Sequence, residues 1–206
     1  MYYSQFQEDK FIVEYCQRYN INLIPVCVEI GASDGKDISN IRHFCLKGCK
    51  GIYVEPIPIR FEQLKKNTIG QDVILYNSAC IPEGANKEVK FKIESCFDFS
   101  HISEENYNLI ARGIYWSEIT KDITDVGVLS IDVEGYETPI LKDVLKSRIR
   151  PQFIIIESNL TTERHAQMKM LLRSNYYLMK MKSKNNVWMD SRIFTQEQDN
   201  AIYNTL

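Results

Sequence analysis

Five short apolar segments recur along the chain, each with the length of one β-strand. They are continuous rather than alternating in polarity, which is typical of strands buried on both faces of a parallel sheet. The segments are residues 26–30, 51–55, 73–79, 128–133 and 153–157. Helical patterns occur between or after them, at residues 38–46, 58–67, 137–146 and 161–172. This alternation predicts an α/β sandwich with right-handed crossovers.

The remaining segments predict further elements. Apolar residues at helical spacing predict a helix over 9–19, within an N-terminal helical extension that spans 1–22. Near the other end, YYLMKMK and NVWMDSRIF flank residues 183–185, which indicates a closing antiparallel hairpin. The chain has no repeat or linker, so we expect one domain over 1–206. The stretch of about 82–125 is too long for a plain connection and is expected to hold a substrate-binding insertion.

Composition and charge argue against several classes of protein. The formal net charge is -2, without a basic stripe, so we expect no nucleic-acid partner. No apolar run approaches the ~20 residues of a membrane span, and the polar start MYYSQFQEDK is unlike a signal peptide. We therefore expect a cytoplasmic protein with no membrane span. The six cysteines include no C-x-x-C pair, which argues against a zinc site.

A loop bracketed by two glycines follows the first predicted strand, in VCVEIGASDGKDIS at 26–39. Such a loop presents unpaired backbone N–H groups that favour a polar or negative ligand. The dinucleotide fingerprint would need glycines where the chain has Ser33 and Lys36. A phosphate-binding loop would need four residues between Gly31 and Gly35, where the chain has three, and a hydroxyl after the lysine. Both familiar nucleotide motifs are therefore absent.

What remains is an acid, Glu29, followed by Gly31 and Gly35, with a second acid, Glu55, at the end of the second strand. An acid in the position of Glu55 can accept hydrogen bonds from both ribose hydroxyls of an adenosine-containing cofactor. A tight turn and a solvated strand end would be the simpler interpretations of these residues. Their order and spacing together favour S-adenosylmethionine as the ligand.

Several motifs resemble those of the FkbM-type S-adenosylmethionine-dependent methyltransferases. The matching pieces are SQFQEDKFI, VEIGASDGKDISN, YVEPIPIRFEQLKKN, NSA at 77–79 and LSIDVEGYETPIL. The resemblance implies a Rossmann-like class I methyltransferase sandwich, with a mostly parallel seven-stranded sheet of order 3-2-1-4-5-7-6. It also implies methyl transfer to oxygen, often a sugar hydroxyl. The chain departs from the common family pattern at Ser33, where Asn is usual, and at Ser130, where Lys is frequent.

These motifs lead us to expect the cofactor against the loop, with Glu29, Gly31 and Gly35 around its methionine moiety and Glu55 on its ribose. Gln5 would fold over the cofactor or simply precede a helix. The full set of expected cofactor-binding residues is Gln5, Glu29, Gly31, Ala32, Ser33, Asp34, Gly35, Glu55, Pro56, Ser78, Ala79 and Asp132.

Candidate catalytic residues follow the fourth and fifth predicted strands, since ligands in open α/β sheets lie beyond the carboxyl ends of the strands. They are Asp132, Glu134 and Glu157. Asp132 could accept the hydroxyl proton as the new bond forms. Alternatively, Asp132, Glu157 and Asn159 could hold Mg²⁺ or Mn²⁺, which would lower the pKa of a bound hydroxyl. The simplest alternative is that Glu157 caps a helix and Asp132 bonds to local backbone.

The acceptor is expected near the insertion and the IDVEGYE motif. Aromatic rings suit the apolar faces of sugars, although core packing is an equal alternative for each ring. The expected substrate-binding residues are Phe97, His101, Tyr115, Trp116 and Glu137. His43 and His165 fall in predicted surface helices and are expected to be solvated.

The leading hypothesis is an O-methyltransferase that acts on a sugar hydroxyl in glycan or glycoconjugate synthesis. The alternative from another class is a non-catalytic nucleotide- or glycan-binding module with the same fold. An NAD-dependent oxidoreductase is disfavoured by the failed fingerprint. The 206 residues could also be one domain of a larger glycan-assembly enzyme.

Overall fold

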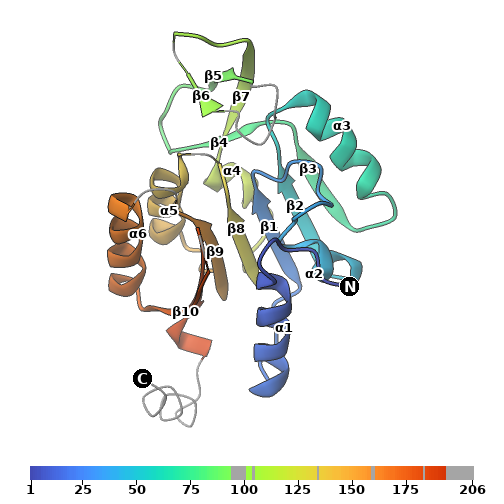
Figure 1. Cartoon of the computed structure of the whole chain (residues 1–206), viewed down its shortest axis with the longest axis vertical. Helices are drawn as coiled ribbons and strands as arrows, with labels where there is room; N and C mark the ends of the chain where they lie inside the picture. The colour runs from blue at the N-terminus through green and yellow to red at the C-terminus, as the bar shows by residue number, and fades with distance from the viewer. Residues whose placement is uncertain (94–100, 104, 134, 159–160, 183, 194–206) are drawn as a thin grey trace.

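A twisted seven-stranded sheet forms the centre of the protein in the computed structural model (Figure 1), which describes residues 1–93, 101–103, 105–133, 135–158, 161–182 and 184–193. The strand order is β3-β2-β1-β8-β9-β11-β10, which becomes 3-2-1-4-5-7-6 when the strands of this sheet alone are counted. β11 is antiparallel to both of its neighbours, and the other described pairs are parallel. The fold is therefore the expected class I methyltransferase arrangement. The strands are β1 (Val26–Ile30), β2 (Lys50–Val54), β3 (Val73–Tyr76), β8 (Val128–Ile131), β9 (Phe153–Glu157), β10 (Tyr176–Lys182) and β11 (Asn185–Asp190).

Helices cover both faces of this sheet because successive strand residues point to opposite sides. One face packs against α4 (Trp116–Ile119), α5 (Glu137–Lys146) and α6 (Thr161–Arg173). The other face packs against α1 (Glu8–Arg18), α2 (Arg42–Leu46) and α3 (Pro58–Asn67). Two apolar cores result, as the continuous apolar strands predicted. No described helix combines the length and apolar character needed to cross a bilayer.

A second, four-stranded sheet has the order β4-β7-β5-β6 and lies beyond one end of the main sheet (Figure 1). Its strands are β4 (Ala79–Ile81), β5 (Glu88–Lys92), β6 (His101–Ile102) and β7 (Leu109–Tyr115). A small core of its own includes Ile81, Val89 and Phe91. The predicted strand at 73–79 is therefore two strands, and the turn between them is held by Asn77, whose Nδ2 donates to the carbonyl of Glu55 at 2.8 Å. Three of its strands, β5, β6 and β7, lie within the stretch of about 82–125, and β4 precedes it.

The second helix is shorter than its sequence pattern predicts. It begins at Arg42 rather than at residue 38, because Ile38 has a φ of 57° and cannot continue a right-handed helix. The hydroxyl of Ser39 and the N–H of Asn40 both donate to the carboxylate of Glu29. The buried carboxylate of Glu29 needs hydrogen-bond donors, and the backbone of residues 38–40 follows a non-helical course that supplies them.

Residues 1–7, which we call the N-terminal strap, run alongside the loop that follows β1. Ser4 forms an isolated parallel bridge with Ile38. Lys180 in the hairpin donates from Nζ to the carbonyl of Phe6 at 3.0 Å. His43, expected to be solvated, is instead buried: its ring stacks on Tyr2, with centroids 4.7 Å apart, and its Nδ1 lies 2.8 Å from the carbonyl oxygen of Met1. His165 is exposed as expected.

Candidate active site

A cavity of about 450 Å³ lies at the carboxyl ends of the central strands, between the loops after β1, β2, β8 and β9. Its volume is in the range of small-molecule sites. Ten of the residues proposed from the sequence line it: Gln5, Glu29, Gly31, Ala32, Ser33, Glu55, Pro56, Ala79, Asp132 and Glu157. The fold therefore brings together most of the residues expected around the cofactor.

Gly31 lets the chain leave β1 within contact distance of the neighbouring strand end. Its φ is 83°, a conformation that L side chains rarely adopt. A Cβ placed on Gly31 would overlap the carbonyl oxygen of Asp132. The N–H groups of Gly31 and Ala32 both donate to the carbonyl of Val54, at 3.0 and 3.1 Å. The glycine thus makes room for a close approach of backbone to backbone beside the cavity.

Glu29 is buried and holds the far part of the same loop. One carboxylate oxygen accepts the hydroxyl of Ser39 at 2.7 Å, and the other accepts the N–H of Asn40 at 2.6 Å. Burial raises the pKa of Glu29 to about 7, although both hydrogen bonds act in the opposite direction. Glu29 therefore orders residues 38–40 in addition to facing the cavity.

Glu55, at the end of β2, also holds backbone N–H groups beside the cavity. Its carboxylate accepts the N–H of Ser33 at 2.8 Å and the N–H of Ile57 at 2.7 Å. Burial raises its pKa to about 7 as well. A carboxylate oxygen has two lone pairs, so each oxygen of Glu55 can accept one more hydrogen bond from a ligand in the cavity. The two hydroxyls of a ribose could supply such donors.

Three expected cofactor residues do not line the cavity. Asp34 accepts the N–H groups of Lys36 and Asp37, both at 2.9 Å, and so closes a local turn. Gly35 has a φ of 65°, and a Cβ there would overlap the side chain of Leu64. Ser78 lines a separate cavity of about 230 Å³. Asp34 and Gly35 shape the loop rather than face the ligand space.

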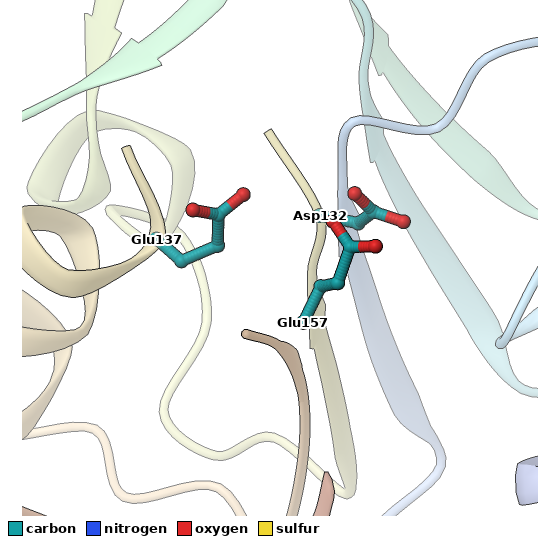
Figure 2. Close-up of side chains that lie close together, drawn as sticks. All are labelled: Asp132, Glu137 and Glu157. Carbon is teal, nitrogen blue, oxygen red and sulfur yellow. The ribbon is translucent and has the colours of Figure 1, made fainter. Parts of the chain in front are cut away.

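Three carboxylates converge at one side of the cavity (Figure 2). One carboxylate oxygen from each of Asp132, Glu137 and Glu157 lies within 4.8 Å of the other two. Asp132 and Glu157 line the cavity, and Lys184 lies nearby with its Nζ 3.6 Å from Glu157 Oε1. Such a spacing of hard oxygen atoms could accommodate a divalent cation.

Glu137 was expected to bind substrate, but it is buried and does not line the cavity. It accepts the N–H of Val133 at 2.8 Å and the N–H of Gly135 at 3.0 Å. Burial raises the pKa of its carboxyl group. Glu137 thus holds the segment that leads from β8 into α5, and it is the third carboxylate of the acidic cluster. Asn159 and Glu134 both lie outside the described residues.

Both expected aromatic contacts from β7 and α4 point elsewhere. The hydroxyl of Tyr115 donates to the carbonyl of Ala85 at 2.8 Å. Trp116 is 2% exposed in the core beneath α4, and its Nε1 donates to Ser147 Oγ at 3.0 Å. Among the described residues, the aromatic side chains that line the cavity beyond the strap are those of Phe91 and Tyr136. Phe97 lies outside the described residues, and for His101 only the backbone in β6 is described.

Sequence reasoning also missed several polar and apolar residues that line the cavity. They are Phe6, Asp37, Ile38, Ser39, Asn40, Ile57, Arg60, Phe91, Ser130, Tyr136 and Lys184. Ser39, Asn40 and Tyr136 fall inside the motifs VEIGASDGKDISN and LSIDVEGYETPIL. Their position in these motifs could have indicated that they line the cavity. Lys184 lies in the predicted hairpin, but no local pattern indicated that this hairpin reaches the cavity.

Comparison with solved structures finds the same fold in known methyltransferases. A precorrin-6y C5,15-methyltransferase from Geobacter metallireducens superposes with a TM-score of 0.50 at 15% identity, over 89% of this chain and 86% of that one. Monomeric WbdD superposes with a TM-score of 0.50 at 10% identity, over 89% of this chain and 41% of that longer one. At such identities the likeness shows the fold alone.

The sequence comparison is more specific. The model of the methyltransferase FkbM domain matches residues 29–179, which include the glycine loop, Glu55 and the acidic cluster. The chain therefore belongs to the FkbM methyltransferase family, whose S-adenosylmethionine dependence implies that cofactor. A search of curated proteins found no match.

Proposed function

We propose that the protein transfers the methyl group of S-adenosylmethionine to a sugar hydroxyl in the synthesis of a glycan or glycoconjugate. The observation that carries the proposal is the placement of the Asp132 and Glu157 carboxylates in the same cavity as Glu29, Gly31 and Glu55. A proton acceptor and the cofactor loop therefore share one ligand space.

The chain offers a suitable partner for each end of the cofactor. Glu55 has lone pairs left for the ribose hydroxyls, and Pro56 and Ile57 beside it line the cavity where an adenine ring would lie. Glu29 presents a buried acid toward the ammonium group of the methionine arm. When bound, S-adenosylmethionine supplies an electrophilic methyl group on its sulfonium. The residues present thus fit the group that the family implies.

Asp132 is the residue that we assign to the proton. It follows β8, the strand next to β1 on the side away from Glu55, so an adenosine end at Glu55 directs the methyl end toward it. A carboxylate is too weak a base to deprotonate an alcohol in advance, so Asp132 would accept the proton as charge develops on the oxygen. Glu157 would orient the acceptor beside it.

A divalent cation is the alternative way to activate the hydroxyl. Mg²⁺ or Mn²⁺ between Asp132 and Glu157 would lower the pKa of a coordinated hydroxyl. The spacing of the carboxylate oxygens, within 4.8 Å, is compatible with this role. The two chemistries differ in their response to a chelator.

The acceptor would lie against the inserted sheet. Phe91 comes from β5 of that sheet, and Tyr136 precedes α5; both line the cavity. Aromatic faces pack well on the C–H faces of a sugar ring. We therefore propose that residues 1–206 act as one domain in which the insertion supplies the acceptor wall. The net charge of -2 offers little attraction to a nucleic acid acceptor.

The test is transfer of a labelled methyl group from the cofactor to a panel of glycosides. Wild-type protein should label at least one of them, and the label should be stable to base, as expected of an ether. Binding of S-adenosylhomocysteine without transfer to any acceptor would favour the non-catalytic module. An absence of binding would overturn the proposed cofactor site itself.

A further inference from the structure

Ile38 combines two properties that rarely occur together. Its φ is 57°, and a β-branched side chain is strongly disfavoured in that left-handed region. Its side chain is 54% exposed, so apolar burial does not explain why isoleucine occupies the position. The other described residues at positive φ, glycines apart, are Gln7, Asn20, Ser33 and Asn175, none of which is β-branched.

The conformation of Ile38 is imposed from both sides. Before the α2 helix, Ser39 and Asn40 are fixed by their hydrogen bonds to Glu29. On the other side, the Ser4 backbone pairs with Ile38 in a parallel bridge. Ser4 is in turn buried, and its Oγ accepts the N–H of Asp9 at 3.1 Å. The surrounding structure can therefore hold a strained residue in place.

Ile38 and Phe6 of the strap both line the cavity, together with the acids Glu29, Glu55 and Asp132. A strained and exposed apolar residue in the lining of a ligand cavity is explained if a bound ligand covers it.

The order of the strands indicates which part of the cofactor would cover Ile38. Glu55 follows β2 and Asp132 follows β8, and β1 lies between these two strands. A cofactor with its ribose at Glu55 and its methyl group near Asp132 must cross the end of β1. Ile38 belongs to the loop that follows β1 and lines the cavity, and its neighbours Ser39 and Asn40 bond to Glu29 rather than to Glu55.

We propose that Ile38, held at positive φ between the strap and the loop ordered by Glu29, packs its side chain against the methionine arm of the cofactor. The inference rests on the proposed cofactor site. Glu29 would receive the polar end of the arm, and Ile38 with Phe6 would cover its methylene groups. Ile38 is a cofactor-binding residue in this scheme.

Paired substitutions separate backbone strain from contact with the ligand. Ile38→Ala and Ile38→Gly both remove the side chain, but only glycine tolerates the left-handed conformation. Ile38→Gly should therefore melt higher than Ile38→Ala, by about 2–4 °C. Ile69 is 80% exposed in a turn without positive φ and provides the control pair. At Ile69 the alanine variant should be at least as stable as the glycine variant.

Calorimetry with two cofactor analogues tests the contact. S-adenosylhomocysteine keeps the amino-acid arm, and 5′-methylthioadenosine lacks it. Ile38→Ala and Ile38→Gly should weaken S-adenosylhomocysteine about fivefold or more and change 5′-methylthioadenosine by less than about twofold. Ile38→Val, which keeps most of the contact, should stay close to wild type, as should both Ile69 variants.

The possible failures are distinguishable. If wild-type protein binds neither analogue, the proposed cofactor site fails and the inference fails with it. If wild-type protein binds both and the Ile38 variants weaken both equally, or weaken neither, only the contact with the arm is overturned. If Ile38→Ala were as stable as Ile38→Gly, the inference that the backbone at position 38 is strained would be overturned.

Discussion

Glu55 at the end of β2 accepts the backbone N–H of Ser33, in the loop after β1, at 2.8 Å. One buried carboxylate thereby joins the loops that follow two neighbouring parallel strands. The same group faces the cavity. The cofactor loop is therefore positioned by the residue that we assign to the ribose, and loop order and ribose binding are coupled.

The first prediction concerns this residue. Glu55→Ala should weaken both S-adenosylhomocysteine and adenosine by about tenfold or more, because two hydrogen bonds to a charged acceptor are lost. Glu55→Gln should lose less affinity for both ligands, since its amide oxygen still accepts one of the two hydrogen bonds. Isothermal calorimetry measures both ligands. Glu62→Gln, on the exposed face of α3, is the control, and unchanged adenosine binding by Glu55→Ala would contradict the assignment.

The second prediction is a pH dependence. Glu29 and Glu55 have pKa values raised by burial from 4.5 to about 7, so the folded protein binds more protons than the unfolded chain between these values. Their contribution to stability is complete below about pH 4.5 and is lost as pH rises to about 7. Glu29→Gln and Glu55→Gln should each flatten this fall in unfolding free energy, measured by denaturant titration at several pH values.

Cofactor binding should show the opposite trend. A ligand that donates hydrogen bonds to Glu55 prefers the ionised carboxylate, so affinity for S-adenosylhomocysteine should rise up to about pH 7 and then level off. Binding near pH 6.5 should release protons. Calorimetry in buffers of different ionisation enthalpy would detect this release, and Glu55→Gln should reduce it. Equal heats in all buffers would contradict the prediction.

The third prediction separates binding from chemistry at Asp132. Asp132→Asn keeps the shape but removes the proton-accepting charge, so turnover should fall by ~10²-fold or more while S-adenosylhomocysteine affinity changes only a few-fold. Asp122→Asn, at an exposed acid, is the control. Loss of wild-type turnover in EDTA, restored by Mg²⁺ or Mn²⁺, would favour the metal alternative. A near wild-type rate in Asp132→Asn would show that Asp132 is structural.

The fourth prediction concerns the close approach at Gly31. Gly31→Ala should destabilise the protein more than Gly48→Ala, although both glycines have positive φ, because only the new Cβ at position 31 would meet backbone. The left-handed conformation alone accounts for about 1–2 kcal/mol at either position. Thermal melts of the two variants provide the comparison. Equal losses would mean that the Asp132 carbonyl can move away.

The fifth prediction tests whether Trp116 stabilises the core rather than binds substrate. Trp116→Phe should lower the melting temperature, because it leaves a cavity in the core and removes the hydrogen bond to Ser147, together about 1–3 kcal/mol. It should leave the affinity for S-adenosylhomocysteine and the Michaelis constant for any acceptor unchanged. Phe91→Ala should instead raise that Michaelis constant, since Phe91 lines the cavity.

The amino-acid sequence by itself determined the main sheet and the cofactor loop. Continuous apolar strands separated by amphipathic helices permit few arrangements other than a parallel sheet covered on both faces. Strand ends in such a sheet meet at one edge, so Glu29, Glu55 and Asp132 could be placed together from their positions along the chain. These inferences depend on the spacing of apolar residues along the chain and on the parallel direction of the strands, and both can be read from the sequence.

Only the tertiary structure decided which side chains face the ligand. Trp116 and Phe91 are both buried aromatic residues, and long-range packing alone decides that only Phe91 also lines the cavity. Lys184 and Phe6 are far apart in the sequence, yet both line the cavity, because Lys180 of the hairpin bonds to the strap at the carbonyl of Phe6. Ile38 was predicted to be helical, but the buried carboxylate of Glu29 requires the hydrogen bonds of the next two residues, and this tertiary demand overrides the local helical pattern.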